Sequence, residues 1–557
     1  MSVLAVALIP LLLFAAAYRL YGALLARRFE LDNSRPTPAL TMADGVDYIP
    51  TAPPILLAQH FSSIAAAGPI VGPILAGLWF GWLPALLWIV LGCIFIGAAH
   101  DFANLVASIR HKARSIAELM KAHVSRRAYV LFLIFIWFSL VYVIVAFTDL
   151  TASTFLAGHY GPGVASSSFL YLLLAVLLGV ALYRWRLPLR IVTPVALLAV
   201  VWIIWFGQQV PISLPDWLPG EPAKSWGMII LGYCFIASVL PLWLLLQPRG
   251  YLGGYFLYGA LLVALVGIAL GDFHVDYPGF LGLHSPKGAP LFPIMFITIA
   301  CGACSSFHGL VCSGTTSKQL QQESHSRLVG YGGMLLEGVL ALIALVTVMI
   351  LVPGSPEAAK SPMEIYASGL AAFASVLGIP VELAMSFGLL AFATFVYDTL
   401  DVATRLGRYI LQELTGWDGA AGRAAATIGT LLLPLLFLVT ANEQAYLTFW
   451  PIFGASNQLL AALSLLGIAV WFIRTGRNAL IFLLPMLFVM AMTLWSLGLY
   501  AAPWLADLSR GSFRIDMIGL VSLILIGLAA LLIVEAIQST RGAKTQRERS
   551  RLARVQE

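Results

Sequence analysis

Charged residues are scarce in this chain. Only 10% of its 557 residues are Asp, Glu, Lys or Arg, whereas 60% are hydrophobic. A soluble domain of this length needs more charge to cover its surface, so this composition argues against a soluble protein. Cysteine is also scarce, and the five thiols lie inside apolar runs, which argues against a disulfide framework. They are Cys93, Cys234, Cys301, Cys304 and Cys312.

Apolar runs of about 20 residues recur from end to end, and each is long enough to cross a hydrocarbon core of about 30 Å. The runs are continuous and do not alternate with a period of two, which indicates helices and not a β-barrel. Residues 2–26 have no basic flank before them and are expected to be a retained span and not a cleaved signal peptide. We predict fifteen spans, at 2–26, 56–79, 82–108, 128–157, 168–187, 189–210, 226–247, 251–270, 291–316, 328–352, 379–404, 424–441, 446–473, 478–501 and 514–539.

The distribution of Lys and Arg predicts the orientation of these spans. If the N-terminus is outside, 26 of the 32 cations fall in inside segments and five in outside loops, with Arg19 in the first span. Cytoplasmic loops of bacterial-type membrane proteins carry this excess. We therefore expect a multi-pass protein of the inner (plasma) membrane with the N-terminus outside and the C-terminus inside. The net charge of +6 is then a membrane feature and not a sign of nucleic-acid binding.

One predicted span contains two Gly-Pro pairs. Residues 62–73 read Ser-Ser-Ile-Ala-Ala-Ala-Gly-Pro-Ile-Val-Gly-Pro. Each proline removes a backbone donor, so a regular helix is not expected over 66–73. Unpaired backbone groups at membrane depth line cavities, which is where transporters bind ions and substrates. The alternative is a simple proline kink. We predict substrate-binding positions at Ser63, Ala67, Gly68 and Gly72.

A second break is predicted at Pro241, within 226–247, with Tyr233 and Ser238 as further substrate-binding candidates. Five spans begin with each break, and five is odd, so the second set enters the membrane from the opposite side. This pattern predicts an all-α membrane protein with a LeuT-type core of five plus five inverted spans. One span precedes the core and four follow it. The predicted regions are 1–55, 56–210, 211–404, 405–540 and a basic cytoplasmic tail, 541–557.

The span 291–316 is unusually polar at Ser305, Ser306 and His308. The hydroxyls suit Na⁺ coordination and the imidazole suits a proton relay, although hydroxyls also join close-packed helices. Cys301, Cys304, His308 and Cys312 share one helical face, but eleven residues of helix cover about 16 Å. Zinc ligands must lie within about 2.3 Å of one point, so no metal site is predicted.

Other ionisable residues lie inside apolar runs, where charge is expensive and usually functional. Asp149 and Glu337 have no cation beside them in sequence and are predicted proton carriers. Asp101, Asp398 and Asp401 are assigned to an inner gate of salt bridges to nearby Arg, with Arg405 one turn beyond Asp401. We find no nucleophile elbow, P-loop or dinucleotide motif, and no cofactor is predicted.

Several motifs together resemble the carbon starvation protein A family, over residues 44–460. They are Asp44-Gly-Val-Asp-Tyr-Ile-Pro50, His60-Phe, Ala67-Gly-Pro-Ile-Val-Gly-Pro73, Gly232-Tyr, Val239-Leu-Pro-Leu-Trp-Leu-Leu-Leu-Gln-Pro-Arg249, Leu291-Phe-Pro, Ile299-Ala-Cys-Gly-Ala303, Ser305 with Phe307-His308, Ser313-Gly-Thr-Thr316, Gly330-Tyr-Gly-Gly-Met334 with Glu337, Asp401 with Thr404-Arg405, and Trp450-Pro with Asn457-Gln458. The resemblance implies the amino acid–polyamine–organocation superfamily and import of peptides or pyruvate, with proton coupling, when carbon is scarce.

The leading hypothesis is therefore a secondary symporter, not an enzyme, that takes up a small organic nutrient across the lipid bilayer. For pyruvate, the positive ends of half-helices at the breaks are expected to hold the carboxylate. Peptide and pyruvate both stay open as the substrate, as do H⁺ and Na⁺ as the coupling ion. An integral membrane enzyme or redox subunit is the rival class. Residues 362–373 are expected to form an outer lid, and no oligomeric state is predicted.

Overall fold

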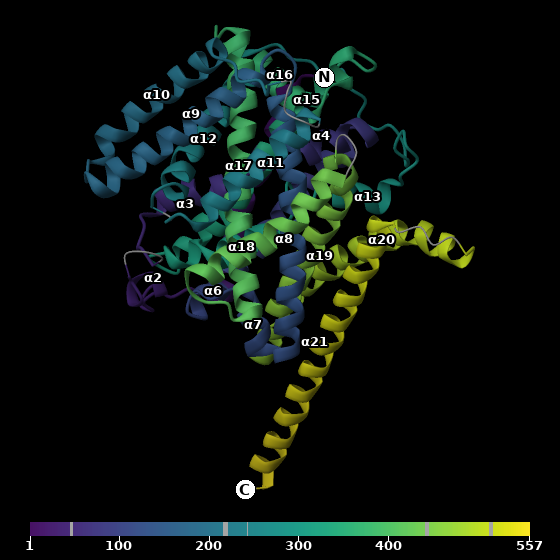
Figure 1. The fold of residues 1–557 in the computed structure, drawn as a ribbon. Helices are drawn as coiled ribbons and strands as arrows, with labels where there is room; N and C mark the ends of the chain where they lie inside the picture. Colours follow the sequence, from purple (N-terminus) through teal and green to yellow (C-terminus); the bar gives the residue numbers. More distant parts are fainter. Residues whose placement is uncertain (45–47, 216–220, 242, 441–444, 512–515, 557) are drawn as a thin grey trace.

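A computed structural model describes the chain except residues 45–47, 216–220, 242, 441–444, 512–515 and 557, and side chains from 542 onward are likewise not described. The described residues form helices and contain no β-strand, only isolated bridges such as that between Ser2 and His274. The two ends of the chain lie at opposite ends of the molecule (Figure 1). Part of the predicted motif 44–50 and the side chains of the predicted tail, 541–557, fall outside the described residues.

The long helices follow the apolar runs. They are α1 (Val3–Phe29), α5 (Trp82–Gly92) continuing through the π-helical turn η1 (Cys93–Gly97) into α6 (Ala98–Arg110), α8 (Arg126–Phe155), α9 (Gly161–Gly179) with η2 (Val180–Arg184), α10 (Leu189–Gln209), α11 (Pro222–Val239), α12 (Leu246–Leu270), η4 (Arg327–Gly332) with α15 (Gly333–Met349), α17 (Val381–Thr415), α18 (Gly419–Thr440), α19 (Ala445–Arg474), α20 (Leu480–Ser509) and α21 (Met517–Gln556).

Shorter helices complete the fold. They are α2 (Pro38–Thr41), α3 (Pro53–Ile64), α4 (Gly68–Phe80), α7 (Ile116–His123), α13 (Leu291–Thr298), α14 (Ser306–Gly314), η3 (Thr316–Lys318), η5 (Pro356–Ala359) and α16 (Pro362–Ser375).

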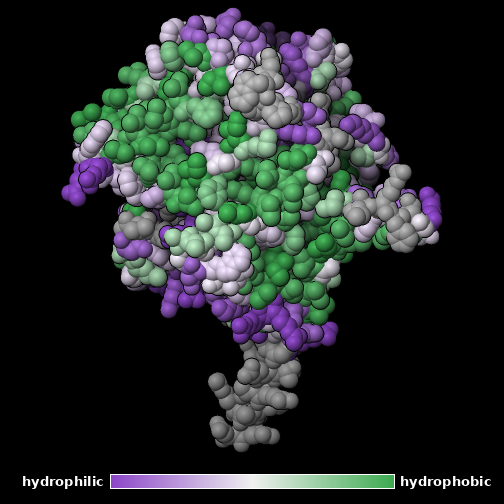
Figure 2. Space-filling view, viewed as in Figure 1, coloured by the Kyte–Doolittle hydropathy of each residue, from purple (hydrophilic) through white to green (hydrophobic). Residues whose placement is uncertain are grey.

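On the face shown in Figure 2, hydrophobic side chains form a broad band across the middle of the molecule, and hydrophilic ones gather above and below it. Among the described residues, 13 helices are long and apolar enough to cross a membrane, and α3 with α4 makes a further, bent span. The prediction of an all-helical, multi-pass membrane protein is therefore confirmed. The remaining predicted span, 291–316, is occupied by α13 and α14, neither of which is long enough to cross alone.

The first predicted break is present but narrower than expected. Helices α3 and α4 meet at 49°, and the chain leaves helical geometry only over Ala65–Ala67. Pro69 lies in the first turn of α4, where a missing N–H has no helical partner to lose. Gly72 and Pro73 also lie inside α4, so the prediction of an irregular backbone over 66–73 is wrong from Gly68 onward.

The second break was predicted in the wrong span. Helix α11 is continuous to Val239, and Pro241 lies in the connection to α12, so this proline ends a span and does not interrupt one. Leu240, before the proline, is extended (φ −68°, ψ 151°), as pre-proline sterics favour. The second interrupted span is α13–α14, in which the helix stops at Thr298 and restarts at Ser306.

The two interrupted spans lie side by side and run in opposite directions. His60 of α3 bonds to Thr316, just beyond α14, through its Nδ1 at 2.9 Å. A Cβ added at Gly72 of α4 would lie 2.5 Å from the carbonyl oxygen of Thr298, at the end of α13. The two interrupted spans are therefore antiparallel, and their breaks lie beside each other.

Neighbouring helices surround this pair. Helix α15 packs on α4 and α5, α6 packs on η4, and α14 packs on α6 and α19. Helix α16 does not form the surface lid that we expected, because it packs on α4, α12, α15 and α17 and most of its side chains are buried. Five predicted spans do lie in each of 56–210 and 211–404, but their pairing as inverted halves stays a prediction.

Candidate functional site

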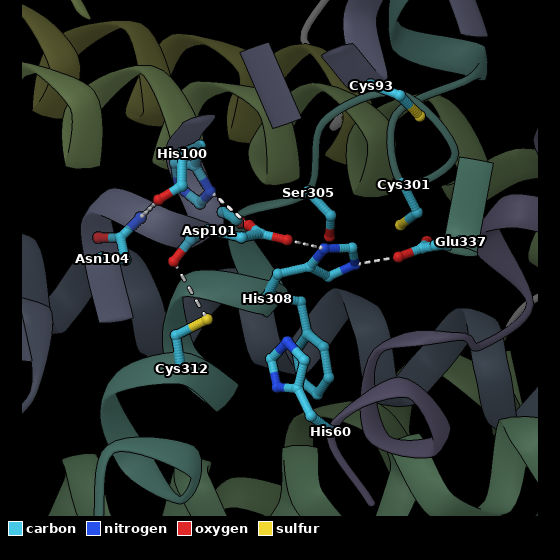
Figure 3. A network of polar contacts seen from close by, with 12 residues as sticks. His60, Cys93, His100, Asp101, Asn104, Cys301, Ser305, His308, Cys312 and Glu337 are labelled. Carbon is cyan, nitrogen blue, oxygen red and sulfur yellow. Dashed lines mark hydrogen bonds and ion pairs between the residues drawn. The ribbon is translucent and has the colours of Figure 1, made fainter. Parts of the chain in front are cut away.

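A histidine between two carboxylates forms the centre of the molecule's buried polar network. Nδ1 of His308 lies 2.8 Å from Oδ2 of Asp101, and its Nε2 lies 2.8 Å from Oε2 of Glu337 (Figure 3). All three side chains are completely buried. They come from three helices: α14 directly after its break, α6, and α15. Sequence reasoning selected all three residues, but it placed Asp101 in an inner gate, whereas the structure places it against His308.

The network extends to two more histidines. His100 Nδ1 lies 2.8 Å from the other carboxylate oxygen of Asp101, and Asn104 donates to the carbonyl of His100 at 2.9 Å. His60 lies below His308 in the view of Figure 3, apart from His100 and Asn104. Its Nε2 is buried and has no hydrogen-bond partner among the described residues. The extended cluster therefore contains three imidazoles and two carboxylates.

No Lys or Arg of the described chain lies within ion-pair distance of Asp101 or Glu337. Buried carboxylates need a compensating positive charge, because the low dielectric of the interior makes an unpaired ion expensive. Here only imidazoles can supply that charge, and they supply it only when protonated. The net charge of this cluster is therefore set by the number of protons that it holds.

Side chains from other helices satisfy the backbone groups that the α13–α14 break leaves open. Oδ1 of Asn457 (α19) accepts from the N–H of Ser306 at 3.0 Å and of Phe307 at 3.3 Å, at the start of α14. At the end of α13, Gln458 donates to the carbonyl of Phe296 at 2.7 Å, and Trp450 donates to that of Thr298 at 3.3 Å. Because buried donors and acceptors must be paired, these contacts fix the break in place.

Ser305 and Ser306 take part in the same arrangement. The hydroxyl of Ser306 donates to Asn457 Oδ1 at 2.6 Å, and that of Ser305 lies 3.3 Å from the same oxygen. Asn457 was quoted above only as part of a motif and was not selected as a site residue. An amide side chain inside an otherwise apolar helix was the available sign of its role.

A second buried ionic cluster lies between α12 and α17. Arg249 is 0% exposed, its Nε lies 3.0 Å from Oδ1 of Asp398, and its Nη1 pairs with Asp401. The hydroxyl of Tyr233 donates to Asp401 at 2.8 Å. Ser62 in the last turn of α3 donates to Asp398 Oδ2 at 2.7 Å. Arg249 was missed by sequence reasoning, because its partners are about 150 residues away.

Arg405 was predicted to pair with these carboxylates, and the structure corrects this. Its Nη2 donates to the carbonyls of Ala237 and Leu240, both at 2.8 Å. These carbonyls lie at the end of α11, where the helix has no N–H left to bond them. Arg405 therefore caps the C-terminus of α11, while Arg249 forms the ion pairs with Asp398 and Asp401.

The remaining predicted residues lie apart from one another. Ser63 donates to the carbonyl of Gln59 in its own helix, and Ser238 lies 3.4 Å from the hydroxyl of Thr427. Asp149 accepts from the N–H of Tyr446 at 2.8 Å, in the first turn of α19, and does not reach His308 or Glu337. Ala67 and Gly68 begin α4 against Cys301 at the other break.

A small cavity of about 30 Å³ lies between the two clusters, on the α3 side of the breaks. It is lined by residues of α3, α12, α17 and the segment that follows α14, which are Leu56, Gln59, His60, Ser63, Leu246, Gly250, Thr315, Thr316, Gln319, Asp398 and Val402. His60 and Asp398 bring one titratable group from each cluster to its wall. The described residues contain no group of three or more His, Cys, Asp or Glu side chains arranged to hold a metal ion.

The sequence profile of the family described as "Carbon starvation protein CstA" matches residues 2–366 and 354–496, most of the chain. The chain belongs to this family. Membership in the CstA family confirms the resemblance inferred from the motifs.

Named relatives in the CstA family are transporters. The chain is 32% identical to the "Peptide transporter CstA" of Helicobacter pylori (strain J99), over 87% of this chain and 80% of the relative. It is 30% identical to the "Pyruvate/proton symporter BtsT" of Escherichia coli K12, with the same coverage. Among solved structures, the chain is similar to a mutant of the manganese transporter of Eremococcus coleocola, with 13% identity, a TM-score of 0.45, and 91% of this chain and 99% of that one covered. With its many apolar helices, this CstA-family chain is a multi-pass membrane transporter.

Proposed function

We propose that this protein is a secondary active transporter that imports a small organic nutrient, pyruvate or a short peptide, together with protons. It acts in the inner membrane with the N-terminus outside and the C-terminus inside, and it serves cells that are short of carbon. Relatives named as a pyruvate/proton symporter and as peptide transporters support the substrate class. The observation that carries the proton coupling is the position of His308 between Asp101 and Glu337.

The geometry of His308 supports a group that holds an additional proton. Both ring nitrogens face carboxylate oxygens at 2.8 Å. A neutral imidazole has only one N–H, so one of the two contacts would bring lone pairs together. One additional proton removes that repulsion, whether it lies on His308 Nε2 or on Glu337. The observed contacts therefore correspond to the proton-loaded cluster.

Loss of this proton has a mechanical consequence. His308 lies on the short helix α14, two residues after its first residue, while its partners lie on α6 and α15. In the loaded state the imidazole bonds to both helices, and in the unloaded state it bonds to one. Protonation thus changes how α14 is held against α6 and α15, and a substrate bound near the breaks would sense that change. Coupling of this kind requires differential contacts in two states, and the cluster provides them.

Uptake of labelled pyruvate and of di- and tripeptides into proteoliposomes tests the proposal. With one proton per substrate, a pH step of one unit gives about tenfold accumulation, because tenfold corresponds to about 1.4 kcal/mol. Glu337→Gln keeps the shape and the contact to His308 but holds no proton. We expect this variant and His308→Gln to lose accumulation and to keep exchange. Glu323→Gln is the matched control, since Glu323 is also buried but is paired with Arg110 at 2.9 Å.

The outcomes separate the alternatives. No uptake of any candidate under either direction of gradient opposes a transporter of these nutrients. Accumulation that requires a sodium gradient and ignores the pH step assigns Na⁺ as the coupling ion. Normal accumulation by both variants shows that the proton is carried elsewhere.

A further inference from the structure

Arg249 holds more negative charge than it can neutralise. Its guanidinium contacts the carboxylates of Asp398 and Asp401, and Nη1 also donates to the Tyr233 hydroxyl at 2.6 Å. Oδ1 of Asp401 is buried and has no hydrogen-bond partner among the described residues. The next cation, Arg405, donates to backbone carbonyls. One guanidinium thus faces two buried carboxylates. One of these carboxylates can therefore be replaced by another anion, and Arg249 still has a charged partner.

Asp398 is the carboxylate within reach of a ligand. It lines the small cavity between the clusters, beside Gly250, which follows Arg249 in sequence. The backbone of α12 packs closely against the other side of this carboxylate, since a Cβ at Gly253 would lie 2.5 Å from the Ser62 hydroxyl and 2.6 Å from Asp398 Oδ2. The cavity of about 30 Å³ has room for about one water in this state, so ligand entry requires Asp398 to move.

Asp401 and two aromatic rings hold the guanidinium in place independently of Asp398. The guanidinium carbon lies 5.1 Å from the ring centre of Tyr397 and 5.8 Å from that of Tyr233. Cation–π contacts of this length stabilise a buried guanidinium without using its N–H groups. If Asp398 leaves, Arg249 keeps its position and offers a planar pair of donors to another carboxylate.

We infer that Arg249 is the anchor for the carboxylate of the transported substrate, and that this carboxylate binds the guanidinium in the place of Asp398. The inference rests on the proposed function and deepens it. Pyruvate and the C-terminus of a peptide both carry this group, so the shared chemistry is a carboxylate. Asp398 takes up one proton as it leaves Arg249, and the substrate brings one negative charge. The net charge of the buried cluster is therefore unchanged by binding.

Equilibrium binding to the purified full-length protein in detergent tests this without any gradient. Pyruvate is compared with its methyl ester, and a dipeptide with the same dipeptide amidated at its C-terminus. We expect whichever acid binds wild-type protein to lose affinity by about 30-fold or more when its carboxylate is masked, as expected for removing one partner of a buried charge pair. The arm that binds identifies the source of the carboxylate.

Variants then locate the anchor. Arg249→Gln should weaken binding of the acid by about 30-fold or more and should no longer discriminate acid from ester or amide. The single variant leaves two buried carboxylates facing each other without a cation. The double variant Arg249→Gln with Asp398→Asn restores the net charge that the cluster has in the wild type, and it should also fail to bind the acid. Asp398→Asn alone removes the competing charge and should bind at least as tightly as wild type at about pH 8. Arg327→Gln is the control. Arg249 Nη2 donates to the carbonyl of Thr394 at 3.4 Å, and Arg327 likewise donates to a carbonyl and lies over a tyrosine ring, both of Tyr18.

Three results would overturn the inference. Wild-type affinity for the acid in the folded double variant shows that Arg249 is not the anchor, and proton-coupled uptake can still stand. Equal binding of acid and masked analogue shows that the carboxylate is not recognised. Weaker binding by Asp398→Asn, matching the loss in Arg249→Gln, shows that Asp398 supports the ligand and is not replaced by it. Absence of accumulation in proteoliposomes with normal carboxylate binding would instead count against the transport proposal alone.

Discussion

Substitution of Gly72 by alanine should separate the two breaks. The Cβ of the new alanine would lie 2.5 Å from the carbonyl oxygen of Thr298 and 3.2 Å from the Cα of Ile299. Both atoms belong to the backbone, so no side chain can rotate away. The Thr298 carbonyl also accepts the indole N–H of Trp450, so a shift of the backbone disturbs that bond as well.

The expected cost follows from overpacking. Forcing a methyl group into a closely packed contact costs about 1–3 kcal/mol. Gly232 of α11 provides the comparison, because a Cβ there meets nothing within 4 Å. Alanine in the middle of a helix is more favourable than glycine by about 0.5–1 kcal/mol, so Gly232→Ala should be neutral or stabilising. Gly72 also lies inside a helix and gains the same preference for alanine, so the two variants should differ by the overpacking cost alone, about 1–3 kcal/mol in the free energy of unfolding.

Thermal unfolding in detergent, followed by tryptophan fluorescence, compares the two variants directly, with proteoliposome uptake as the second measurement. Gly72→Ala should lower both the unfolding midpoint and the uptake rate, and Gly232→Ala should lower neither. Equal midpoints for the two variants would show that α4 and α13 are not in backbone contact at this point. The antiparallel placement of the interrupted spans would then be wrong.

Two further perturbations probe the surroundings of the site. Asn457→Ala leaves the N–H groups of Ser306 and Phe307 buried without a partner, so it should lower the free energy of unfolding by about 2 kcal/mol or more. Asn457→Asp keeps an acceptor oxygen and should recover part of this loss. Denaturant titration of both variants measures the difference. At the end of α7, burial, His111 and Arg474 lower the pKa of His123 from its ordinary value near 6.5 to about 4. Between these two pKa values the unfolded protein binds more protons than the folded protein, so the free energy of unfolding should fall as the pH is lowered from 6.5 to 4. Unfolding midpoints measured across this range should show the fall in the wild type and a smaller one in His123→Gln.

Local features of the sequence predicted the spans and part of the site. Apolar run length is a property of each segment alone, and so is the cost of a Gly-Pro pair in a helix, which marked the first break. His308 and Glu337 were identified because an ionisable residue in an apolar run is rarely without a function. None of these arguments requires knowledge of what lies beside the segment.

Partners across the fold could not be predicted in this way. Arg405 was paired with Asp401 because the two are one turn apart, yet the guanidinium that binds Asp401 is that of Arg249, on another helix. The break over 299–305 contains no proline, and its Gly, Ala, Cys and Ser residues are compatible with a helix. It exists because Asn457, Gln458 and Trp450 of α19 bond to its backbone groups, and their position depends on the tertiary fold.

The burial of α16 bears on which parts of the molecule move together. A Cβ at Gly388 of α17 would lie 2.9 Å from the Cα of Ala367, and one at Gly369 of α16 would lie 2.5 Å from the Cβ of Thr347 in α15. At Gly267 of α12 an added Cβ would collide with the carbonyl of Phe373. Backbones in such direct contact leave no compliant layer of side chains to shear. We therefore expect one rigid body that comprises α12, α15, α16 and α17. In any conformational change α16 would move together with these neighbours and would not open and close by itself.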